Sequence, residues 1–259
     1  MTKVCLIVGA GAGIGLATAR RFAKNGYHIC MVRRSDQAGL DKSINGLIAD
    51  GHQATGFILD VTACDLLEAL IVKIENDIGE IHTAVYNVGA QIGDRDLGST
   101  TLNVFELGWK LGTFGLFRLA KALMPYMVKR SLGTLLVTGA TASVRGNGGQ
   151  HSHAATMASR RMLCQSLNAE FAPKGIHIAH IVIDGLIDAP DTLGKMMGLA
   201  AFEDLKQRKG YEKNGLLIPD QIADSYFHLA HQHPSAWTHE LDLRPHSALP
   251  WWNHHKLDL

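Results

Sequence analysis

Three glycines near the start of the chain have the spacing of a turn that binds phosphate. Gly9, Gly13 and Gly15 follow a short apolar run, residues 4–8, and open a helical pattern. A turn from a strand into a helix offers free backbone N–H groups and the positive end of the helix dipole to an anion. The spacing therefore predicts that these glycines, together with Ile14 between them, hold the diphosphate of a dinucleotide.

Two arginines, Arg33 and Arg34, end the second apolar run, eighteen and nineteen residues after Gly15. In a dinucleotide-binding fold this position lies beside the adenosine ribose. An acidic side chain there accepts a hydrogen bond from the 2′-hydroxyl, whereas an arginine pairs with a 2′-phosphate. The two arginines therefore favour NADP(H) over NAD(H) as the cofactor.

Polar and small residues also mark the ends of the next two apolar runs. Asp60 and Val61 come directly after residues 54–59, and Asn87 and Gly89 stand at the end of residues 81–87. Open parallel sheets bind ligands in the crevice at the carboxyl ends of their strands. We therefore assign these four residues to the same cofactor site.

The elements that must position these residues alternate along the chain, as in a parallel α/β sheet. The expected strands are residues 4–8, 28–32, 54–59, 81–87, 134–138, 177–183 and a last one near 238–243. The expected helices are residues 14–24, one ending near 50, 66–74, 103–129, 152–171 and one opened by 219–224. This order predicts one Rossmann-type domain over residues 1–259, a doubly wound parallel sheet of about seven strands with helices on both faces.

Two segments depart from the alternation. Residues 186–215 are longer than an ordinary connection and are expected to form a lid or substrate loop. The tail, residues 244–259, carries Trp251 and Trp252, which favours a subunit contact or packing of the tail on its own chain.

The composition of the chain limits the classes of partner that it can have. The chain of 259 residues has a formal net charge of +1 with interspersed signs, so we expect no nucleic-acid partner. No apolar window approaches eighteen residues, which predicts no membrane contact. Four cysteines without CxxC spacing indicate a reduced, cytoplasmic protein. His151 and His153 lack a third ligand nearby, so no metal site is expected.

The pattern resembles the short-chain dehydrogenase/reductase family over essentially the whole chain. GAGAGIG is similar to its TGxxxGxG turn, LDV to its adenine-contacting D-V, and YNVGA to its NNAG. The resemblance implies a seven-stranded sheet, NAD(P)(H), and hydride transfer between a carbonyl and an alcohol of a small molecule. It also implies a homo-oligomer, a dimer or tetramer, and assigns Ile187, in the loop after residues 177–183, to the cofactor site.

The same resemblance shows that the family's four catalytic positions are all substituted. The family uses Asn, Ser, Tyr and Lys, where tyrosine exchanges the proton and lysine lowers the tyrosine pKa. Anchored by EFAPKGIHIAHIVIDG downstream, these positions fall on Gly112, Ala140, His153 and Met157. The loop after residues 177–183 departs too, because Asp184-Gly185 replaces the usual Pro-Gly and Ala189 aligns with a threonine that often holds the nicotinamide carboxamide.

Three interpretations of the substituted site follow. In the first, the protein is an oxidoreductase in which His153 is the acid/base and Thr141 or Ser143 donates to the substrate oxygen. Histidine has a reference pKa near 6.5 and needs no lysine to reach neutrality. In the second, the chain binds dinucleotide without catalysis. In the third, His151 or His153 is the base of a lyase, dehydratase or isomerase.

Overall fold

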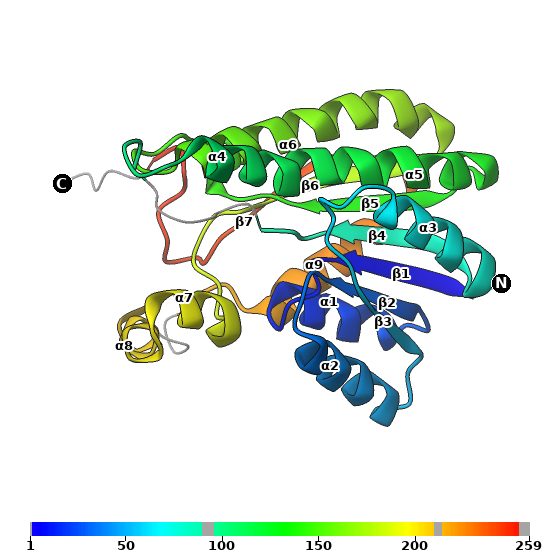
Figure 1. Ribbon diagram of the computed structural model, residues 1–259, viewed down its shortest axis with the longest axis horizontal. Coiled ribbons are helices and arrows are strands. Elements are labelled where there is room, and N and C mark those ends of the chain that lie inside the picture. Colours follow the sequence, from blue (N-terminus) through cyan, green and yellow to red (C-terminus); the bar gives the residue numbers. More distant parts are fainter. Residues whose placement is uncertain (1, 90–95, 210–213, 254–259) are drawn as a thin grey trace.

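The central element is a sheet of seven parallel strands (Figure 1), seen in a computed structural model that describes residues 2–89, 96–209 and 214–253. The strand order is β3-β2-β1-β4-β5-β6-β7. The order reverses between β1 and β4, which is where open α/β sheets form their ligand crevice. The strands are β1 (Lys3–Val8), β2 (His28–Arg33), β3 (Ala54–Ile58), β4 (Glu80–Tyr86), β5 (Gly133–Thr138), β6 (Ile176–Ile183) and β7 (Glu240–Leu243).

Helices cover both faces of the sheet (Figure 1). One layer contains α3 (Leu66–Asp77), α5 (Gly115–Arg130) and α6 (His151–Phe171). The other contains α1 (Ile14–Ala23), α2 (Gln37–Ala49) and α9 (Pro219–Ala230). The expected doubly wound Rossmann-type fold is therefore confirmed, and every expected strand is present with ends that differ by at most two residues.

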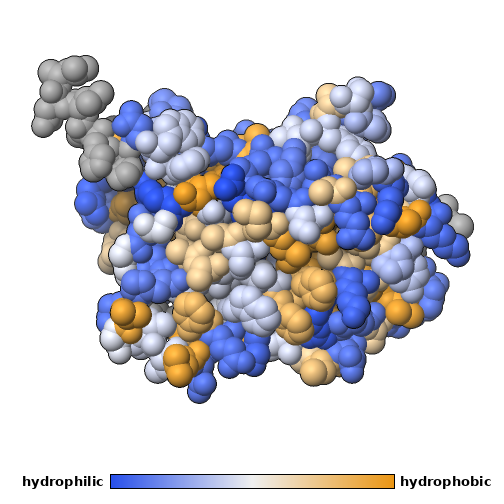
Figure 2. Space-filling model, turned by 90° about the horizontal axis from the view of Figure 1, so that it is seen from above, coloured by the Kyte–Doolittle hydropathy of each residue, from blue (hydrophilic) through white to orange (hydrophobic). Residues whose placement is uncertain are grey.

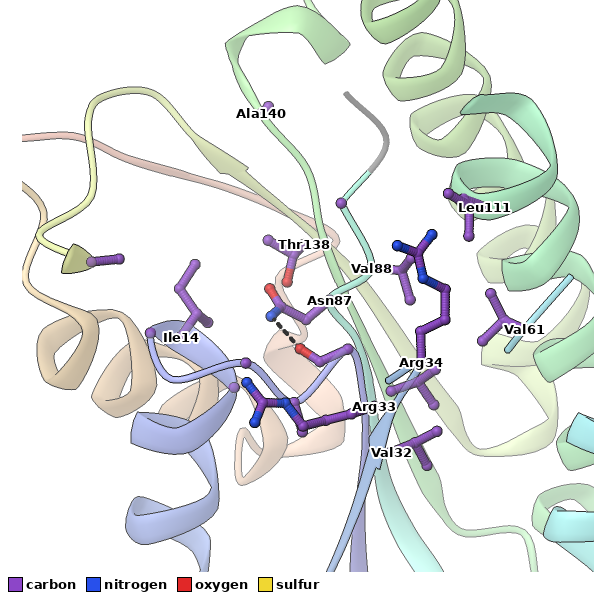
Figure 3. A pocket seen from close by; sticks show the side chains of 18 of the residues that line it. Ile14, Val32, Arg33, Arg34, Val61, Asn87, Val88, Leu111, Thr138 and Ala140 are labelled. Carbon is purple, nitrogen blue, oxygen red and sulfur yellow. Dashed lines mark hydrogen bonds between the residues drawn. The ribbon is translucent and has the colours of Figure 1, made fainter. Parts of the chain in front are cut away.

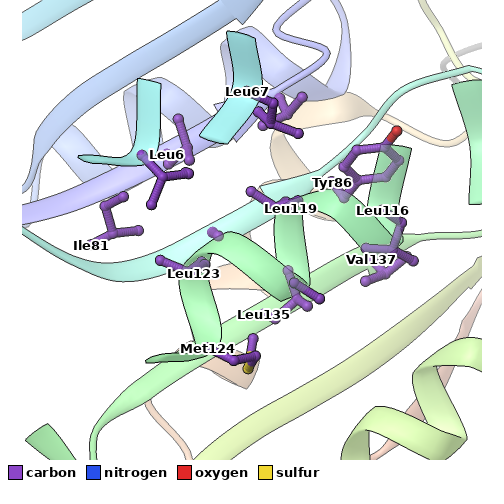
Figure 4. Close-up of a cluster of buried hydrophobic side chains, with 14 of the residues drawn as sticks. Leu6, Leu67, Ile81, Tyr86, Leu116, Leu119, Leu123, Met124, Leu135 and Val137 are labelled. Carbon is purple, nitrogen blue, oxygen red and sulfur yellow. The ribbon is translucent and has the colours of Figure 1, made fainter. Parts of the chain in front are cut away.

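The sheet is buried because its strands are nearly continuous apolar runs, as expected for a parallel sheet covered on both faces. All eight residues of β6 are buried. In the layer drawn in Figure 4, Leu6 and Leu135 of the sheet pack with Leu119 and Leu123 of α5 in one buried cluster. This packing fixes the strand ends that carry the site.

The expected helix over residues 103–129 is divided. It consists of α4 (Leu102–Trp109), a π-helical turn (Lys110–Phe114) and α5. The insertion also has structure of its own, a π turn (Pro190–Gly194), α7 (Lys195–Met197) and α8 (Leu199–Lys209), and it stands at one end of the molecule (Figure 1). Residues 210–213 of the insertion and 254–259 of the tail lie outside the described residues. None of the described helices is long and apolar enough to span a membrane.

The described part of the tail folds back onto the domain. The Trp251 N–H donates to the Asp184 carboxylate over 2.9 Å, and Arg145 donates to the Trp251 carbonyl over 3.2 Å. The Arg244 guanidinium lies 4.3 Å from the centre of the Trp252 ring. These contacts attach the tail beside the loop that follows β6.

Candidate functional site

A cavity of about 810 Å³ lies at the carboxyl ends of β1, β2, β4 and β5 (Figure 3). Its size suits a small-molecule or cofactor site. The cavity brings together every residue that the sequence assigned to the cofactor, and His153 lies in the same wall. The assigned residues are Gly9, Gly13, Ile14, Gly15, Arg33, Arg34, Asp60, Val61, Asn87, Gly89 and Ile187.

The turn after β1 requires glycine for steric reasons. Gly9 has φ +91°, and a Cβ there would stand 2.6 Å from the Asn87 carbonyl oxygen and 2.8 Å from the Val88 nitrogen. A Cβ on Gly15 would stand 2.7 Å from the Ala10 Cα. Gly13, the N-cap of α1, has no side chain that could cap the helix. The N-terminus of α1 therefore has no side-chain cap, and its first residues, Ile14 and Gly15, line the cavity, which fits an anionic ligand.

Asn87 stabilises this turn from the neighbouring strand. Its side-chain amide donates to the Gly9 carbonyl over 3.0 Å, the dashed line in Figure 3. Asp60 is also engaged, because one of its carboxylate oxygens accepts from the backbone N–H and the hydroxyl of Thr62, at 2.8 and 2.7 Å. A Cβ on Gly89 would meet no atom of the described residues within 4 Å. Hydrogen bonds thus hold the residues after β3 and β4, and Gly89 leaves space in the described part of the wall.

The two arginines at the end of β2 differ in their surroundings and leave the strand in different directions (Figure 3). Arg33 forms an ion pair with Asp36 at 3.0 Å, and Asp36 in turn caps α2 by accepting from the Gly39 N–H. Arg34 is exposed and forms no ion pair with a described residue. Arg34 therefore supplies the more available positive charge at this end of the cavity.

The opposite end is formed by the first turns of α6. The helix begins at His151, which is exposed, while His153 is partly buried and lines the cavity. Met157 lies one turn further along the same helical face, is 4% exposed and packs with Ala142. Ala140, at the end of β5, completes this wall. His153 is the one titratable side chain among the four residues that the resemblance placed at the catalytic positions.

Thr141 and Ser143 are not among the residues that line the cavity. They belong to a short 3₁₀ turn that directs their hydroxyl groups back toward β6. The Thr141 hydroxyl donates to the Asp184 carboxylate over 2.7 Å. The Ser143 oxygen accepts from the Ala140 N–H over 3.2 Å and lies 3.4 Å from Nε2 of His180. The structure therefore does not bring these hydroxyls together with His153.

His180 is the centre of a buried polar chain behind this wall. Its Nδ1 lies 3.0 Å from the Glu240 carboxylate, which also accepts two hydrogen bonds from Arg161. Burial lowers the pKa of His180 to about 4, and the bond to Glu240 opposes only part of that effect. A neutral imidazole here supports the turn at Ser143 without entering the cavity.

Arg160 is a residue of this site that the sequence reasoning missed. It lines the cavity, is 1% exposed and donates to three backbone carbonyls. The acceptors are Gly112 at 2.9 Å, Thr138 at 2.7 Å and Val88 at 2.9 Å. The sequence contains one signal for Arg160, its spacing from His153 and Met157. Residues 153, 157 and 160 share one helical face, and an arginine is rarely found on a buried face.

Comparison with known proteins agrees with this geometry. A sequence model described as short chain dehydrogenase matches residues 3–192. The chain belongs to the short-chain dehydrogenase family. Among its relatives, the 3-oxoacyl-[acyl-carrier-protein] reductase FabG of Escherichia coli is 29% identical over 194 residues, 73% of this chain and 75% of that protein.

Two solved structures superimpose over nearly the whole chain. A short-chain dehydrogenase from Rhodopseudomonas palustris has a TM-score of 0.77 and 27% identity, covering 94% of this chain and 99% of that one. A gluconate 5-dehydrogenase from Burkholderia cenocepacia, in complex with NADP and tartrate, has a TM-score of 0.80 and 22% identity and covers 94% of both chains. The second likeness supports the fold.

Membership of the short-chain dehydrogenase family gives the substituted positions their meaning. The chain keeps the glycine turn and the strand ends, but the side chains of Ala140 and Met157, which line the cavity beside His153, carry no hydrogen-bond donor. Among the residues at those four positions, His153 alone carries a side chain that can give or take a proton.

Proposed function

We propose that this chain is an NADP(H)-dependent oxidoreductase that transfers hydride between the cofactor and the carbonyl or alcohol carbon of a small molecule. One observation carries the proposal: His153 lines the same cavity as the glycine turn and the strand ends that fit a dinucleotide. The relatives point the same way, since the name of FabG describes a reductase and the gluconate 5-dehydrogenase structure holds NADP.

The residues present fit a nicotinamide dinucleotide at both ends of the cavity. The uncapped N-terminus of α1 suits the diphosphate, and Arg34 suits a 2′-phosphate, with Arg33 beside it but already paired with Asp36. Ile187 and Ala189 line the same cavity, and Ala189 lies against the glycine turn, since a Cβ on Gly13 would stand 3.1 Å from the Ala189 Cβ. The nicotinamide, which supplies the hydride when bound, would lie at the end near His153.

His153 would then give or take the proton of the substrate oxygen. A protonated imidazole donates to the oxygen as a carbonyl becomes an alcohol, and a neutral imidazole accepts the proton in the reverse direction. The neighbouring Met157 and Ala140 can do neither. Thr141 and Ser143 are committed to Asp184 and to the turn in front of His180, so they are left out of the proposed chemistry.

Because the hydroxyl groups of Thr141 and Ser143 are already engaged by other residues, the site also favours one alternative function. In this alternative the protein binds a dinucleotide without catalysis. A positioned acid or base contributes about a hundred- to ten-thousand-fold to a rate. Of the residues at the four catalytic positions only His153 could act. If His153 did not face the substrate, turnover would therefore be very slow. This alternative shares the cofactor site and differs only in turnover.

Turnover of wild type and two single variants separates these functions. We expect NADPH-dependent reduction of at least one member of a carbonyl panel, a loss of about a hundredfold or more in His153→Ala, and unchanged NADPH binding by that variant. His151→Ala is the matched control, since His151 is exposed on the same helical turn and should change little. NADPH binding without turnover would support the binding protein, and a reaction without nicotinamide would refute both functions.

The insertion is proposed to cover the substrate. Its helix α8 is attached to the loop after β6 by Lys206, whose ammonium lies 3.3 Å from the Asp188 carboxylate. Asp188 immediately follows the cavity residue Ile187. Movement of residues 186–215 would therefore reach the cavity wall directly.

We also propose that the chain assembles with copies of itself through the face formed by α4, α5 and α6. Hydrophobic side chains gather across the middle of this face (Figure 2). Trp109, Phe114 and Phe117 are exposed and stack in a row, with ring centres 5.3 and 6.5 Å apart. The adjoining groove of about 480 Å³ carries both lysine and glutamate side chains, so a two-fold copy could pair opposite charges.

Light scattering across a concentration series tests this assembly. We expect a dimer or tetramer for wild type and a smaller species for Phe117→Asp. Ile48→Asp, on the exposed side of α2 in the opposite layer, should leave the mass unchanged. A monomeric wild type at all concentrations would contradict the proposal.

A further inference from the structure

Arg160 joins three backbone segments at one end of the cavity. Its guanidinium donates to the carbonyls of Val88 after β4, Thr138 at the end of β5 and Gly112 in the π turn, all within 2.9 Å. These segments are far apart in the sequence, although β4 and β5 are neighbouring strands and the Tyr86 hydroxyl also joins β4 to the π turn through the Leu111 carbonyl. A planar guanidinium can bind several carbonyls at fixed angles, which a lysine ammonium cannot match.

The positive charge of Arg160 has no acidic partner among the described residues. The ionisable groups that interact with it include Tyr86, Cys164 and Tyr226, and its charge also lowers the pKa of the neutral His180. Burial raises the pKa of both tyrosines and raises the pKa of Cys164 to about 12, so all three are neutral near pH 7. Burial also lowers the pKa of Arg160, but an arginine stays protonated in proteins. The cavity wall thus contains a buried cation that forms no ion pair with a carboxylate of the described residues.

The position of this cation follows from helix geometry. Arg160 lies three residues after Met157, at the position where the family's lysine is missing, and seven residues after His153. At 1.5 Å per residue these separations are about 4.5 and 10.5 Å along the helix axis. The positive charge of Arg160 therefore lies about one turn further along α6 than position 157, farther from the His153 imidazole but still in the wall of the cavity.

We propose that Arg160 is a positioning residue of this site that fixes the three backbone segments and, through its unneutralised charge, makes the cavity bind NADPH in preference to NADP⁺. The nicotinamide ring is neutral in the reduced cofactor and cationic in the oxidised one, so a buried cation disfavours only the oxidised form. This inference rests on the proposed dinucleotide site. It bears on the direction of the reaction, because tighter binding of the reduced cofactor favours reduction of a carbonyl.

The expected size of the effect follows from Coulomb's law. Two unit charges about 10 Å apart, at an effective dielectric constant of about 20 to 40, change an equilibrium constant by roughly four- to twentyfold. A purely structural role of Arg160 would weaken both cofactors alike. The ratio of the two dissociation constants therefore separates the charge from the hydrogen bonds.

Calorimetric titration of wild type, Arg160→Lys, Arg160→Gln and Arg160→Met with NADPH and with NADP⁺ tests the proposal. Lysine keeps the charge, glutamine keeps donors without the charge, and methionine removes both. We expect wild type to bind NADPH about fourfold or more tightly than NADP⁺. Arg160→Lys should keep that ratio even if both constants rise, whereas Arg160→Gln and Arg160→Met should lower it by roughly four- to twentyfold.

The outcomes are distinguishable. If wild type binds neither cofactor, the proposed function fails. If wild type binds both with NADP⁺ equal or tighter, the inference about Arg160 fails while the dinucleotide site stands, and this comparison needs no variant. An unchanged ratio in a folded neutral variant would overturn the inference as well, and the melting temperature of each variant without cofactor shows which ones fold.

Discussion

Replacement of Gly9 by alanine, compared with the same change at Gly26, isolates the steric demand of the turn that would hold the diphosphate. The two glycines have similar left-handed conformations, with φ +91° and +80°. They differ in their surroundings. A Cβ at Gly26 meets nothing within 4 Å, whereas a Cβ at Gly9 would meet three backbone atoms of Asn87 and Val88 at 2.6 to 2.8 Å.

The structure sets the expected magnitudes. A non-glycine residue in the left-handed region costs about 1 kcal/mol in both variants. At Gly9 the added methyl group also forces backbone atoms apart, and overpacking of this kind costs about 1–3 kcal/mol more. For a domain of this size 1 kcal/mol corresponds to roughly 2–4 °C in melting temperature. We therefore expect a loss of about 2–4 °C for Gly26→Ala and at least twice that for Gly9→Ala.

Thermal unfolding by circular dichroism, followed by NADPH titration of both variants, is the assay. Because Asn87 donates to the Gly9 carbonyl, displacement of this peptide should also disturb the end of β4 and weaken NADPH binding. Gly26→Ala should bind NADPH like wild type. Equal melting temperatures for the two variants, or normal NADPH binding by Gly9→Ala, would refute the reasoning that this close approach shapes the site.

Two further predictions concern charged side chains. Arg33→Ala combined with Arg34→Ala should weaken NADPH binding roughly tenfold and leave NADH binding nearly unchanged, since hydrogen bonds to charged groups contribute about 1.5 kcal/mol or more. The control is Arg20→Ala, because Arg20 is exposed on α1. Equal losses of affinity for both cofactors would show that no 2′-phosphate is bound at these arginines. The contribution of His180 to stability in urea should be constant above about pH 6.5 and fall by roughly 3 kcal/mol as the pH drops toward 4, because buried His180 has a pKa of about 4 and the unfolded chain takes up the proton first. His180→Gln should remove that part of the pH dependence, and an unchanged slope in this variant would assign it to other groups.

The sequence predicted the parts of the fold that depend on local patterns. The apolar runs of β1 and β6 identify buried strands, and Asp60 and Asn87 mark strand ends because polar residues follow the runs. The glycine spacing also predicted the turn after β1, where a Cβ on Gly15 would meet the nearby Ala10, although the contact of Gly9 with Asn87 could not be predicted from spacing. These features require no knowledge of distant contacts.

The rest of the site depends on contacts between distant segments. Nothing in residues 103–129 indicates the π turn at Lys110–Phe114, whose Gly112 carbonyl receives Arg160 from another helix. Thr141 and Ser143 had suitable positions in the sequence, but the hydrogen bonds to Asp184 and the approach of His180 direct their hydroxyls away from the cavity. Long-range partners of this kind cannot be read from spacing alone.

Arg160 also bears on the proposal that the catalytic positions are substituted. This buried cation lies about one turn beyond Met157 along α6 and joins the segments that meet at the cavity through their backbone carbonyls. A site that had simply decayed would not require a buried arginine, because an unpaired buried charge is costly. The arrangement therefore supports a site that still binds a ligand.

A crystal structure of the protein grown with excess NADPH tests the central claim most directly. The account predicts the diphosphate over the N-terminus of α1 at Gly13, the adenosine ribose beside Arg34, and the nicotinamide ring between Ile187 and His153. A cavity without the dinucleotide, or a dinucleotide bound elsewhere on the chain, would contradict it.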